Sequence, residues 1–483
     1  MDKKVSIARN YAYNVALQIT NILIPFITTP YVTRVLDPTG LGISAFTLSV
    51  VQYFILLASL GTALYGSRAI AYVRTNPEDL RKTFWEIFYV KLFAGTASSL
   101  LYVGFVLSAV RQYRNVYLIQ YLNLLGSILD ISYLFQGIEE FKKIAMRSIG
   151  VRVVSTVAIF LFVKRESDFV VYVLISALGN LLGQLVMWMF LPKGCRRVQK
   201  ANWRSILSHI PGSLKLFIPM VAIQIYVVLD KTMVGILSSK SEVAYYDMAQ
   251  KIVKMALSLV TAIGPVMLSR VSSLAAKGDK DSIDRYISDV FDFVTYASIF
   301  MIVVLFTTMR YFVPVFFGEK FYGVKDLILV ISPILLFISW SNLFGVQIMI
   351  PFKMEKQFTL SVVTGAVVNF LLNLLLIPRY AALGASVATV VAEFCVTAVQ
   401  MVSVRNRIPL KSMFRVVPKH ALAGTTVLVF GYVLSELIRF GNIVMVIFNF
   451  AVVASVYVLM ECFLKSKINS FIFSKLMSVL KRL

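Results

Sequence analysis

Apolar stretches of membrane-spanning length recur along the whole chain, with short polar segments between them. A transmembrane helix needs roughly 20 mostly apolar residues, and each stretch is close to that length or longer. The pattern predicts fourteen spans, at 11–33, 41–64, 84–109, 115–135, 145–163, 168–192, 213–237, 244–268, 290–317, 325–350, 358–377, 381–404, 418–437 and 442–463. The expected fold class is therefore an all-α integral membrane protein with about 14 transmembrane helices.

Composition agrees with this pattern and excludes several classes of protein. Of the 483 residues, 58% are hydrophobic and only 15% are charged. Soluble domains have a charged fraction near one quarter and an apolar fraction below one half. These values exclude a water-soluble globular protein, a disordered chain and an enzyme held by a single anchor. Long apolar runs also exclude an outer-membrane barrel, whose strands alternate apolar and polar residues.

The formal net charge is +24, and the positions of the basic residues predict an orientation. With the N-terminus inside, the inner segments hold 32 of the 48 Lys and Arg residues and the outer loops hold 10. Cytoplasmic loops are enriched in Lys and Arg, so we expect a multi-pass protein of the bacterial inner membrane with both termini cytoplasmic. No run of basic and aromatic residues is typical of a nucleic-acid groove, and no nucleic-acid partner is expected.

The first twelve helices read as two related halves. Prolines interrupt the first helix of each half, Pro25 and Pro30 in one and Pro219 in the other, and are candidate hinges. The tripeptides at 35–37 and 228–230 are alike, both ending in Leu-Asp. Because six helices return the chain to its starting side, the repeats must be parallel. We expect an N-lobe at 1–192, a C-lobe at 193–404, two added helices at 405–464 and an amphipathic interfacial tail at 465–483.

The sequence contains no set of residues with the spacing of a catalytic site or a metal site. The three cysteines, Cys195, Cys395 and Cys462, lie far apart, and the two histidines, His209 and His420, stand alone in basic loops. No phosphate-binding G-x-x-x-x-G-K-[ST] motif occurs. We therefore expect no enzyme activity, no metal site, no cofactor and no ATP hydrolysis. Transport would draw on an ion gradient, the membrane potential or consumption of the product.

Amide side chains inside the predicted spans are the candidate sugar ligands. Several repeat at helical spacing, so that one helix face carries two or three of them, as a cavity that binds hydroxyl groups would require. The alternative is hydrogen bonding between helices, worth only about 0.6 kcal/mol each. The candidates are Asn14, Gln18, Asn21, Gln120, Asn123, Asn180, Gln184, Asn369 and Asn373.

Charged residues inside the spans are the second group of candidates. A charge at the centre of a span costs roughly 2.5–3.5 kcal/mol on insertion scales, so such groups should face a cavity or one another. For Arg152 and Arg310 the alternative is a side chain reaching the interface, while Lys91 and Asp130 are candidates to pair. The cations expected to hold an anionic headgroup are Lys91, Arg152, Lys231 and Arg310, and the acids expected in coupling or gating are Asp130, Asp230 and Glu393.

Three stretches of the sequence together resemble one transporter family. They are RVLDPTGLG at 34–42, LDKTMVGIL at 229–237, and FKMEK at 352–356, which is followed by the paired asparagines of the eleventh span. With fourteen spans in two six-helix halves, the chain resembles the Wzx-type polysaccharide flippases. These belong to a superfamily that also includes the MATE multidrug exporters and the lipid II flippase MurJ. Departures at Asp37, Ala244 and Ala381, where such proteins often have glycine, affect the expected loop geometry.

The resemblance implies a V-shaped two-lobe fold with a cationic cavity that works by alternating access. The implied cargo is an undecaprenyl-diphosphate-linked oligosaccharide, moved from the inner to the outer leaflet for surface polysaccharide synthesis. A polysaccharide polymerase and a chain-length regulator are candidate protein partners. Alternatives are a flippase for lipid II or teichoic-acid precursors, a MATE-like ion-coupled exporter, a membrane glycosyltransferase, which the short outer loops disfavour, and a non-transporting scaffold.

Overall fold

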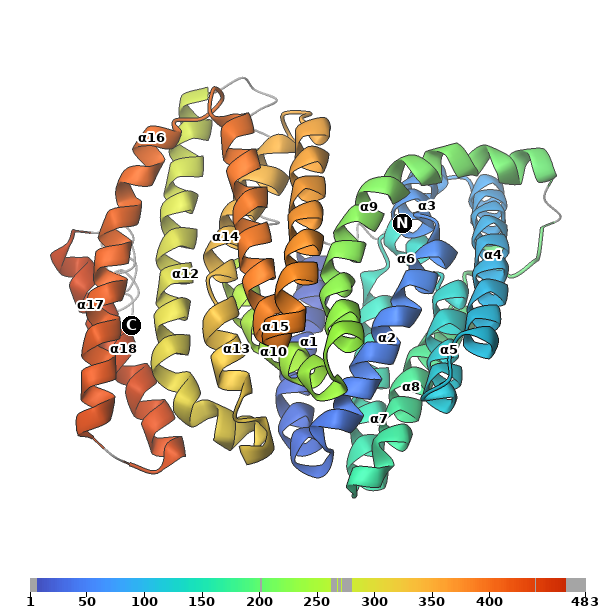
Figure 1. Ribbon diagram of the computed structural model, residues 1–483. Coiled ribbons are helices and arrows are strands. Elements are labelled where there is room, and N and C mark those ends of the chain that lie inside the picture. The colour runs from blue at the N-terminus through green and yellow to red at the C-terminus, as the bar shows by residue number, and fades with distance from the viewer. Residues whose placement is uncertain are drawn as a thin grey trace, which may run out of the picture. The chain divides into compact units, whose positions relative to one another are not determined.

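The computed structural model describes residues 7–199, 202–261, 267, 271, 280–438 and 440–465 (Figure 1). Within these residues the only regular secondary structure is helical. The chain divides into two compact units, Met1–Ala244 and Tyr245–Leu483. The predicted tail at 465–483 lies almost wholly outside the described residues, and so does part of the predicted span at 244–268.

The first unit contains nine long or short α-helices and the start of a tenth among its described residues. They are α1 (Ile7–Val35), α2 (Pro38–Ser59), α3 (Thr62–Val73), α4 (Pro77–Ser108), α5 (Arg114–Leu129), α6 (Ser132–Gly137), α7 (Phe141–Phe162), α8 (Phe169–Met189), α9 (Trp203–Leu237) and α10 (Lys240–Thr261). Helix α1 packs against α7, α7 against α8, and α8 against α5. These packing partners place α1, α7 and α8 next to one another.

The second unit continues α10 and adds the remaining helices. They are α12 (Lys280–Phe317), α13 (Val324–Ile331), α14 (Ile334–Ser341), the π-helix η4 (Asn342–Met349), α15 (Glu355–Val404), α16 (Leu410–Met413), α17 (Val417–Leu437) and α18 (Asn442–Phe463). Helices α12, α17 and α18 pack against one another as a three-helix group (Figure 1). The two C-terminal helices expected as an addition therefore rest on α12.

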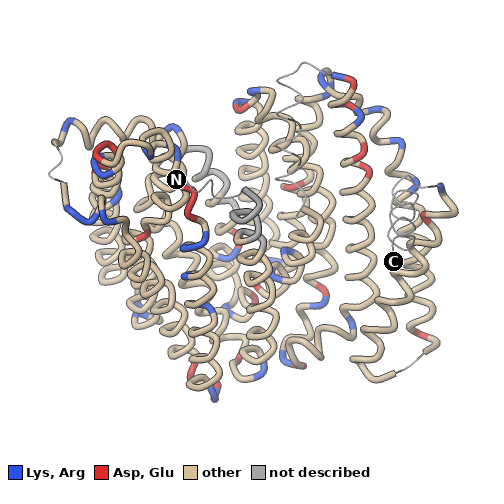
Figure 2. Tube along the Cα trace, turned by 180° about the vertical axis from the view of Figure 1, so that it is seen from behind, with Lys and Arg blue, Asp and Glu red and all other residues tan. Residues whose placement is uncertain are grey.

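Helix lengths and composition agree with a protein that crosses the membrane many times. Among the described residues nine helices are long and apolar enough to span a bilayer, or ten when the bent pair formed by α13 with α14 and η4 is included. Helices α1, α9 and α10 fall at three further predicted spans. Lys, Arg, Asp and Glu lie mainly at helix ends and connections, with long uncharged stretches between them (Figure 2).

One helical element, α15, covers two predicted spans, 358–377 and 381–404. The backbone leaves helical geometry inside it at Ala381, where φ is 50° and ψ is −130°. A Cβ added to Gly384 would lie 2.6 Å from the carbonyl carbon and oxygen of Leu376, so the chain reverses tightly around this point. The left-handed φ would suit a glycine at position 381, as the resemblance implied, better than the alanine that is present.

The N-termini of two helices are fixed by capping residues and prolines. Asp37 accepts a hydrogen bond from the backbone N–H of Thr39 at 2.9 Å, and Pro38 is the first residue of α2. Asn76 and Pro77 have the same roles at the start of α4. Such caps satisfy backbone donors that a helix leaves free at its N-terminus. Asp37 is thus an efficient N-cap of α2.

Two of the stretches that resemble the transporter family, 34–42 and 229–237, belong to helices that pack together. A Cβ on Gly42 would lie 1.6 Å from the carbonyl oxygen of Lys240, and one on Gly235 would lie 2.1 Å from the ring of Phe46. Ser49 also shares a hydrogen bond of 2.9 Å with Thr232. Because α9 packs in this way on α2, and also on α3 and α4, it belongs to the first compact unit, which ends at Ala244. The expected lobes at 1–192 and 193–404 remain a prediction.

The candidate hinge prolines do not break their helices. Helix α1 is continuous through Pro25 and Pro30, and α9 is continuous through position 219, although the side chain of Pro219 is not described. The prediction that prolines interrupt these helices is therefore wrong, because the helices continue through them. Helix α9 nevertheless bends strongly along its length (Figure 1), and a hinge role for these prolines remains a prediction.

Candidate functional site

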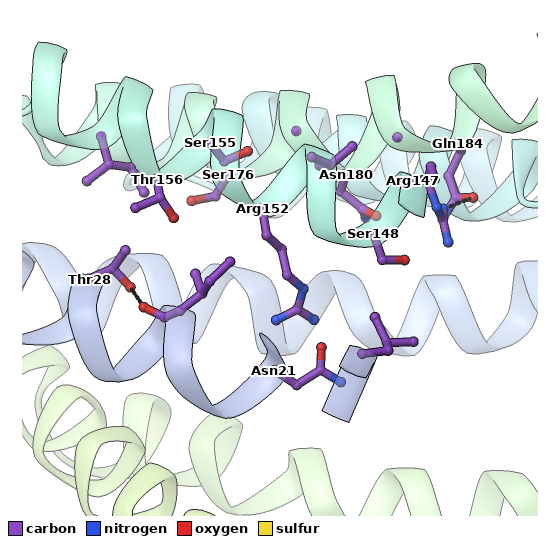
Figure 3. A pocket seen from close by; sticks show the side chains of 16 residues that line it. Asn21, Thr28, Arg147, Ser148, Arg152, Ser155, Thr156, Ser176, Asn180 and Gln184 are labelled. Carbon is purple, nitrogen blue, oxygen red and sulfur yellow. Dashed lines mark hydrogen bonds between the residues drawn. The ribbon is translucent and has the colours of Figure 1, made fainter. Parts of the chain in front are cut away.

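A polar pocket of about 450 Å³ lies in the first unit between α1, α7 and α8 (Figure 3). Its volume is in the range of typical small-molecule sites. Hydroxyl, amide and guanidinium groups from all three helices reach it. The lining residues are Leu17, Asn21, Ile24, Thr28, Arg147, Ser148, Val151, Arg152, Ser155, Thr156, Ile159, Ser176, Gly179, Asn180, Gly183 and Gln184.

Arg152 is the central charge of this pocket. Its half-buried side chain extends from α7 toward α1, so that the guanidinium lies close to Asn21 (Figure 3). Among the described residues it has no hydrogen bond or ion pair. An arginine inside a membrane helix is costly unless it is paired. Arg152 therefore has donors available for a ligand, and its role in binding an anionic headgroup remains a prediction.

A second arginine, Arg147, lies one and a half turns earlier on the same helix. Its Nη1 donates a 2.7 Å hydrogen bond to Oε1 of Gln184 on α8, while its Nε is buried and has no hydrogen-bond partner in the part of the chain that the structure describes. Arg147 lies at the very start of the predicted span 145–163 and was not among the predicted cations. A signal was present, because Ser148, Arg152 and Ser155 share one helix face at spacings of four and three residues, and Arg147 directly precedes Ser148.

Two glycines of α8 leave the space that the pocket needs. A Cβ on Gly179 would lie 2.3 Å from Oγ of Ser155, and one on Gly183 would lie 3.0 Å from Cγ2 of Val151. Without these glycines α8 would be pushed away from α7. The close approach of the helices therefore fixes the width of the pocket on this side.

The electrostatic character of the pocket is basic. Two arginines and no Asp or Glu occur among the described residues that line it. Arginine offers five N–H donors in a planar fork that matches phosphate and carboxylate oxygens. The surrounding serine, threonine and amide groups can donate to and accept from hydroxyl groups. Chemically, the pocket suits an anionic group that is attached to a hydroxyl-rich one.

The predicted amides divide between this pocket and a buried polar chain. Asn180 lines the pocket and donates to Asn123 at 3.0 Å, and Asn123 donates to Gln120 at 2.7 Å. Gln120 in turn donates to the hydroxyl of Thr47 on α2 at 3.3 Å. Gln120 and Asn123 are thus satisfied between helices, as the alternative reading described, while Asn180 connects their chain to the pocket.

The remaining amides lie in different surroundings. Asn21 and Gln184 line the pocket, Gln18 is exposed on α1, and the side chain of Asn14 is not described. In the second unit, Asn373 donates a 3.0 Å hydrogen bond to Asn369 one turn away, and both residues are fully buried on α15. That pair lies outside this pocket.

The other predicted cations have partners elsewhere. Lys91 is buried on α4 and donates to the backbone carbonyl of Asp130 at 2.6 Å, so the expected pairing runs through the main chain. Arg310 is exposed and forms a 2.6 Å ion pair with Glu436. Lys231 is half-buried on α9. None of these three lines the pocket at Arg152.

The predicted acids are placed on three different helices or helix ends. Asp130 lies between α5 and α6, where its carboxylate accepts the backbone N–H of Ser132 at 2.8 Å. Asp230 is buried on α9 and Glu393 is buried on α15. These placements leave a coupling or gating role for the three acids as a prediction.

Both histidines have acidic partners, which corrects the expectation that they stand alone in basic loops. His209 on α9 shares hydrogen bonds with Tyr65 at 2.7 Å and with buried Glu86 at 3.0 Å. His420 is buried in the second unit between two carboxylates. The sequence gives no signal for these contacts, because the partners are more than 40 residues away.

Comparison with known proteins places the chain in a family. The family model described as polysaccharide biosynthesis protein matches residues 7–274, which is more than half of the chain. The chain belongs to this family. Membership confirms the resemblance noted in the sequence.

Relatives and solved structures extend this result. The chain is 23% identical over 406 residues to an Escherichia coli (strain K12) protein described as a "Putative O-antigen transporter", covering 83% of this chain and 98% of the relative. A Shigella dysenteriae protein with the same description is 23% identical over 80% of this chain and 96% of its own length. Both relatives are matched along almost their entire length.

The fold is shared with two groups of transporters. The lipid II flippase MurJ in an inward closed conformation has a TM-score of 0.74 at 16% identity, covering 95% of this chain and all of that structure. An inward-facing MATE family transporter of the MOP superfamily has a TM-score of 0.62 at 11% identity, covering 83% of this chain and 96% of that structure. At these identities the likeness defines the fold, and this member of the polysaccharide biosynthesis family therefore has the MOP superfamily fold.

Proposed function

We propose that this protein is a flippase that moves undecaprenyl-diphosphate-linked oligosaccharides from the cytoplasmic to the outer leaflet for surface polysaccharide synthesis. Arg147 and Arg152 hold the diphosphate in the pocket between α1, α7 and α8. Family membership and the described function of the relatives support the glycan class. The single observation that carries the proposal is the half-buried Arg152, which has no partner among the described residues and lies in a pocket whose described lining contains no acid.

The diphosphate is the part of such a cargo that most needs a protein site. An unshielded anion does not enter hydrocarbon, because moving a charge out of water costs many kcal/mol. Guanidinium groups replace the lost water with charge-assisted hydrogen bonds. Asn21, Asn180 and Ser176 offer hydrogen-bonding groups to the sugar that is attached to the diphosphate, while the lipid chain remains in the bilayer.

Direction and location follow from charge. With both termini in the cytoplasm of a bacterial cell, an inside-negative potential favours outward movement of an anion by roughly 2.3 kcal/mol per charge per 100 mV. The protein then acts as a transporter without catalytic chemistry. A polysaccharide polymerase and a chain-length regulator on the outer side would use its product.

The pocket also discriminates between this cargo and that of a MATE-like drug exporter. A cavity that binds organic cations should contain carboxylates, whereas this one contains two arginines and no acid among its described lining residues. A flippase for lipid II or for a teichoic-acid precursor shares the phosphate chemistry and is the nearer alternative. These cargoes differ in the sugar attached to the phosphate, so measuring which sugars the protein accepts would decide between them.

Reconstituted flipping tests the proposal. The full-length protein is placed in liposomes that contain a fluorescent undecaprenyl-diphosphate-linked sugar, and a membrane-impermeant quencher measures how much of the lipid reaches the outer leaflet. We expect flipping of the diphosphate lipid and none of an otherwise identical neutral glycolipid. Equal rates for both lipids, or export of organic cations in place of either, would overturn the proposal.

A further inference from the structure

A buried cluster of three titratable side chains joins α12, α17 and α18 in the second unit. His420 on α17 lies between Asp292 on α12 and Glu461 on α18, and these residues are 2%, 7% and 0% exposed. Nδ1 of His420 lies 2.7 Å from Oε1 of Glu461, and Nε2 lies 2.6 Å from Oδ1 of Asp292. One side chain from each helix therefore takes part in a continuous hydrogen-bonded chain.

The number of protons in this cluster follows from the two hydrogen bonds. A neutral imidazole has a single N–H, and an ionised carboxylate can only accept. Two bonds from one ring to two carboxyl groups therefore require two protons, either both on His420 or one on the ring and one on a carboxyl group. With an imidazolium the cluster has a net charge of −1. Losing one of these protons breaks a bridge and leaves a larger buried negative charge.

Glu461 offers a place for a further proton. Its second oxygen, Oε2, is buried and has no hydrogen-bond partner in the described part of the chain. No Lys or Arg forms an ion pair with the cluster among the described residues. Leaving such an oxygen ionised and unpaired in a low-dielectric setting is costly, so binding a proton here would make the cluster neutral.

The groups around the cluster come from the same three helices. The ring of Tyr296 on α12 lies edge-on to His420 with centroids 5.8 Å apart, and the hydroxyl of Tyr457 on α18 donates to the carbonyl of Tyr296 at 3.1 Å. Cys462 follows Glu461 on α18, and Lys419, next to His420, is exposed. The immediate neighbours are therefore aromatic, and they limit the access of water.

Access is possible from one side through a pocket of about 360 Å³ that reaches Asp292. Asp284, Arg285, Ser288 and Asp289 of α12 line it together with Asp292, and residues between Pro409 and Val416 form its other wall. Both walls lie close to the connections between the predicted spans 244–268 and 290–317 and between 381–404 and 418–437, which the predicted orientation places on the cytoplasmic side. The acids of the pocket attract protons toward Asp292.

We propose that Asp292, His420 and Glu461 form a proton-binding site that is loaded from the cytoplasmic side and holds α17 and α18 against α12. The bound proton bridges the three helices, so their packing depends on internal pH. The inference does not depend on which cargo the protein carries.

Nitrogen NMR on the full-length protein tests the protonation state directly. The chain has two histidines, so the His209→Gln variant leaves His420 as the single imidazole. With ¹⁵N-labelled histidine we expect both ring nitrogens to be protonated at pH 7. A neutral ring that titrates at the ordinary value of about 6.5 would overturn the proposal.

A stability profile tests the consequence for helix packing. An unfolded chain holds its histidine proton below about pH 6.5, and the folded chain needs a second proton to complete the two bridges at His420. The stabilisation is therefore complete below that pH and declines as the pH rises. We expect this decline in wild type and in the control Lys419→Gln, and its loss in His420→Gln and Glu461→Gln. Identical profiles for wild type and His420→Gln would overturn the inference, whether or not flipping of the diphosphate lipid is observed.

Discussion

Removing the guanidinium of Arg152 should weaken diphosphate binding without unfolding the protein. The side chain has no partner among the described residues, so the Arg152→Ala variant leaves no protein group unsatisfied. Its half-buried position gives it partial access to solvent. Hydrogen bonds to charged groups contribute about 1.5–3 kcal/mol each, and partial exposure favours the lower part of this range. A loss of about 2 kcal/mol corresponds to a roughly 30-fold increase in Kd.

Substitution by lysine separates charge from geometry. Arg152→Lys keeps the positive charge but loses the planar fork that can bond two phosphate oxygens at once. We expect a loss of about 1 kcal/mol, or roughly fivefold in Kd. Arg147→Ala should lose at least as much binding free energy as Arg152→Ala, because the substitution also leaves Gln184 in the pocket without its 2.7 Å hydrogen bond.

The assay is equilibrium binding of undecaprenyl-diphosphate-linked sugar to the purified full-length protein in nanodiscs. Lys142→Ala is the matched control, since Lys142 lies on the same helix, is exposed and carries the same charge. Thermal unfolding of each variant shows whether the fold is retained. If Arg147→Ala and Arg152→Ala both bind within twofold of Lys142→Ala, the pocket is not the diphosphate site and the reasoning fails.

Three further predictions concern helix packing and backbone strain, and all are measured by thermal unfolding of the purified protein. Gly42→Ala should strongly destabilise the protein, because the added Cβ would lie 1.6 Å from the backbone carbonyl oxygen of Lys240. Gly104→Ala is the control, because nothing lies within 4 Å of its added Cβ, and it should stabilise α4 by about 0.5–1 kcal/mol. Equal effects would contradict the close approach of α2. Ala381→Gly should stabilise by about 1 kcal/mol, because φ of 50° with ψ of −130° is costly for alanine, and no gain would mean that the backbone is unstrained. Lys91→Met should destabilise by about 2 kcal/mol, since it removes the charged hydrogen bond from the buried Lys91 to the carbonyl of Asp130. An unchanged melting temperature would contradict that role.

The sequence identified the pocket in part, and the reasons for success and failure are physical. Arg152 could be singled out because an arginine inside a span must have a compensating environment. Arg147 escaped because it lies at the edge of its span, where basic residues are ordinary. Lys91 was grouped with Arg152 because both are intramembrane cations, yet its partner is a main-chain carbonyl 39 residues away. No side-chain pattern reveals such an acceptor.

Helix existence, membrane character and family were determined by the sequence alone, because the transfer of about 20 apolar residues into hydrocarbon dominates every local preference. Which polar groups meet was decided only by tertiary structure. The amides of α5 turned inward to bridge helices, while Asn21 and Asn180 reached the pocket. His420 forms hydrogen bonds with two carboxyl groups from helices that are distant in sequence. Periodicity states which residues share a helix face, but the neighbour of that face depends on how all the helices pack.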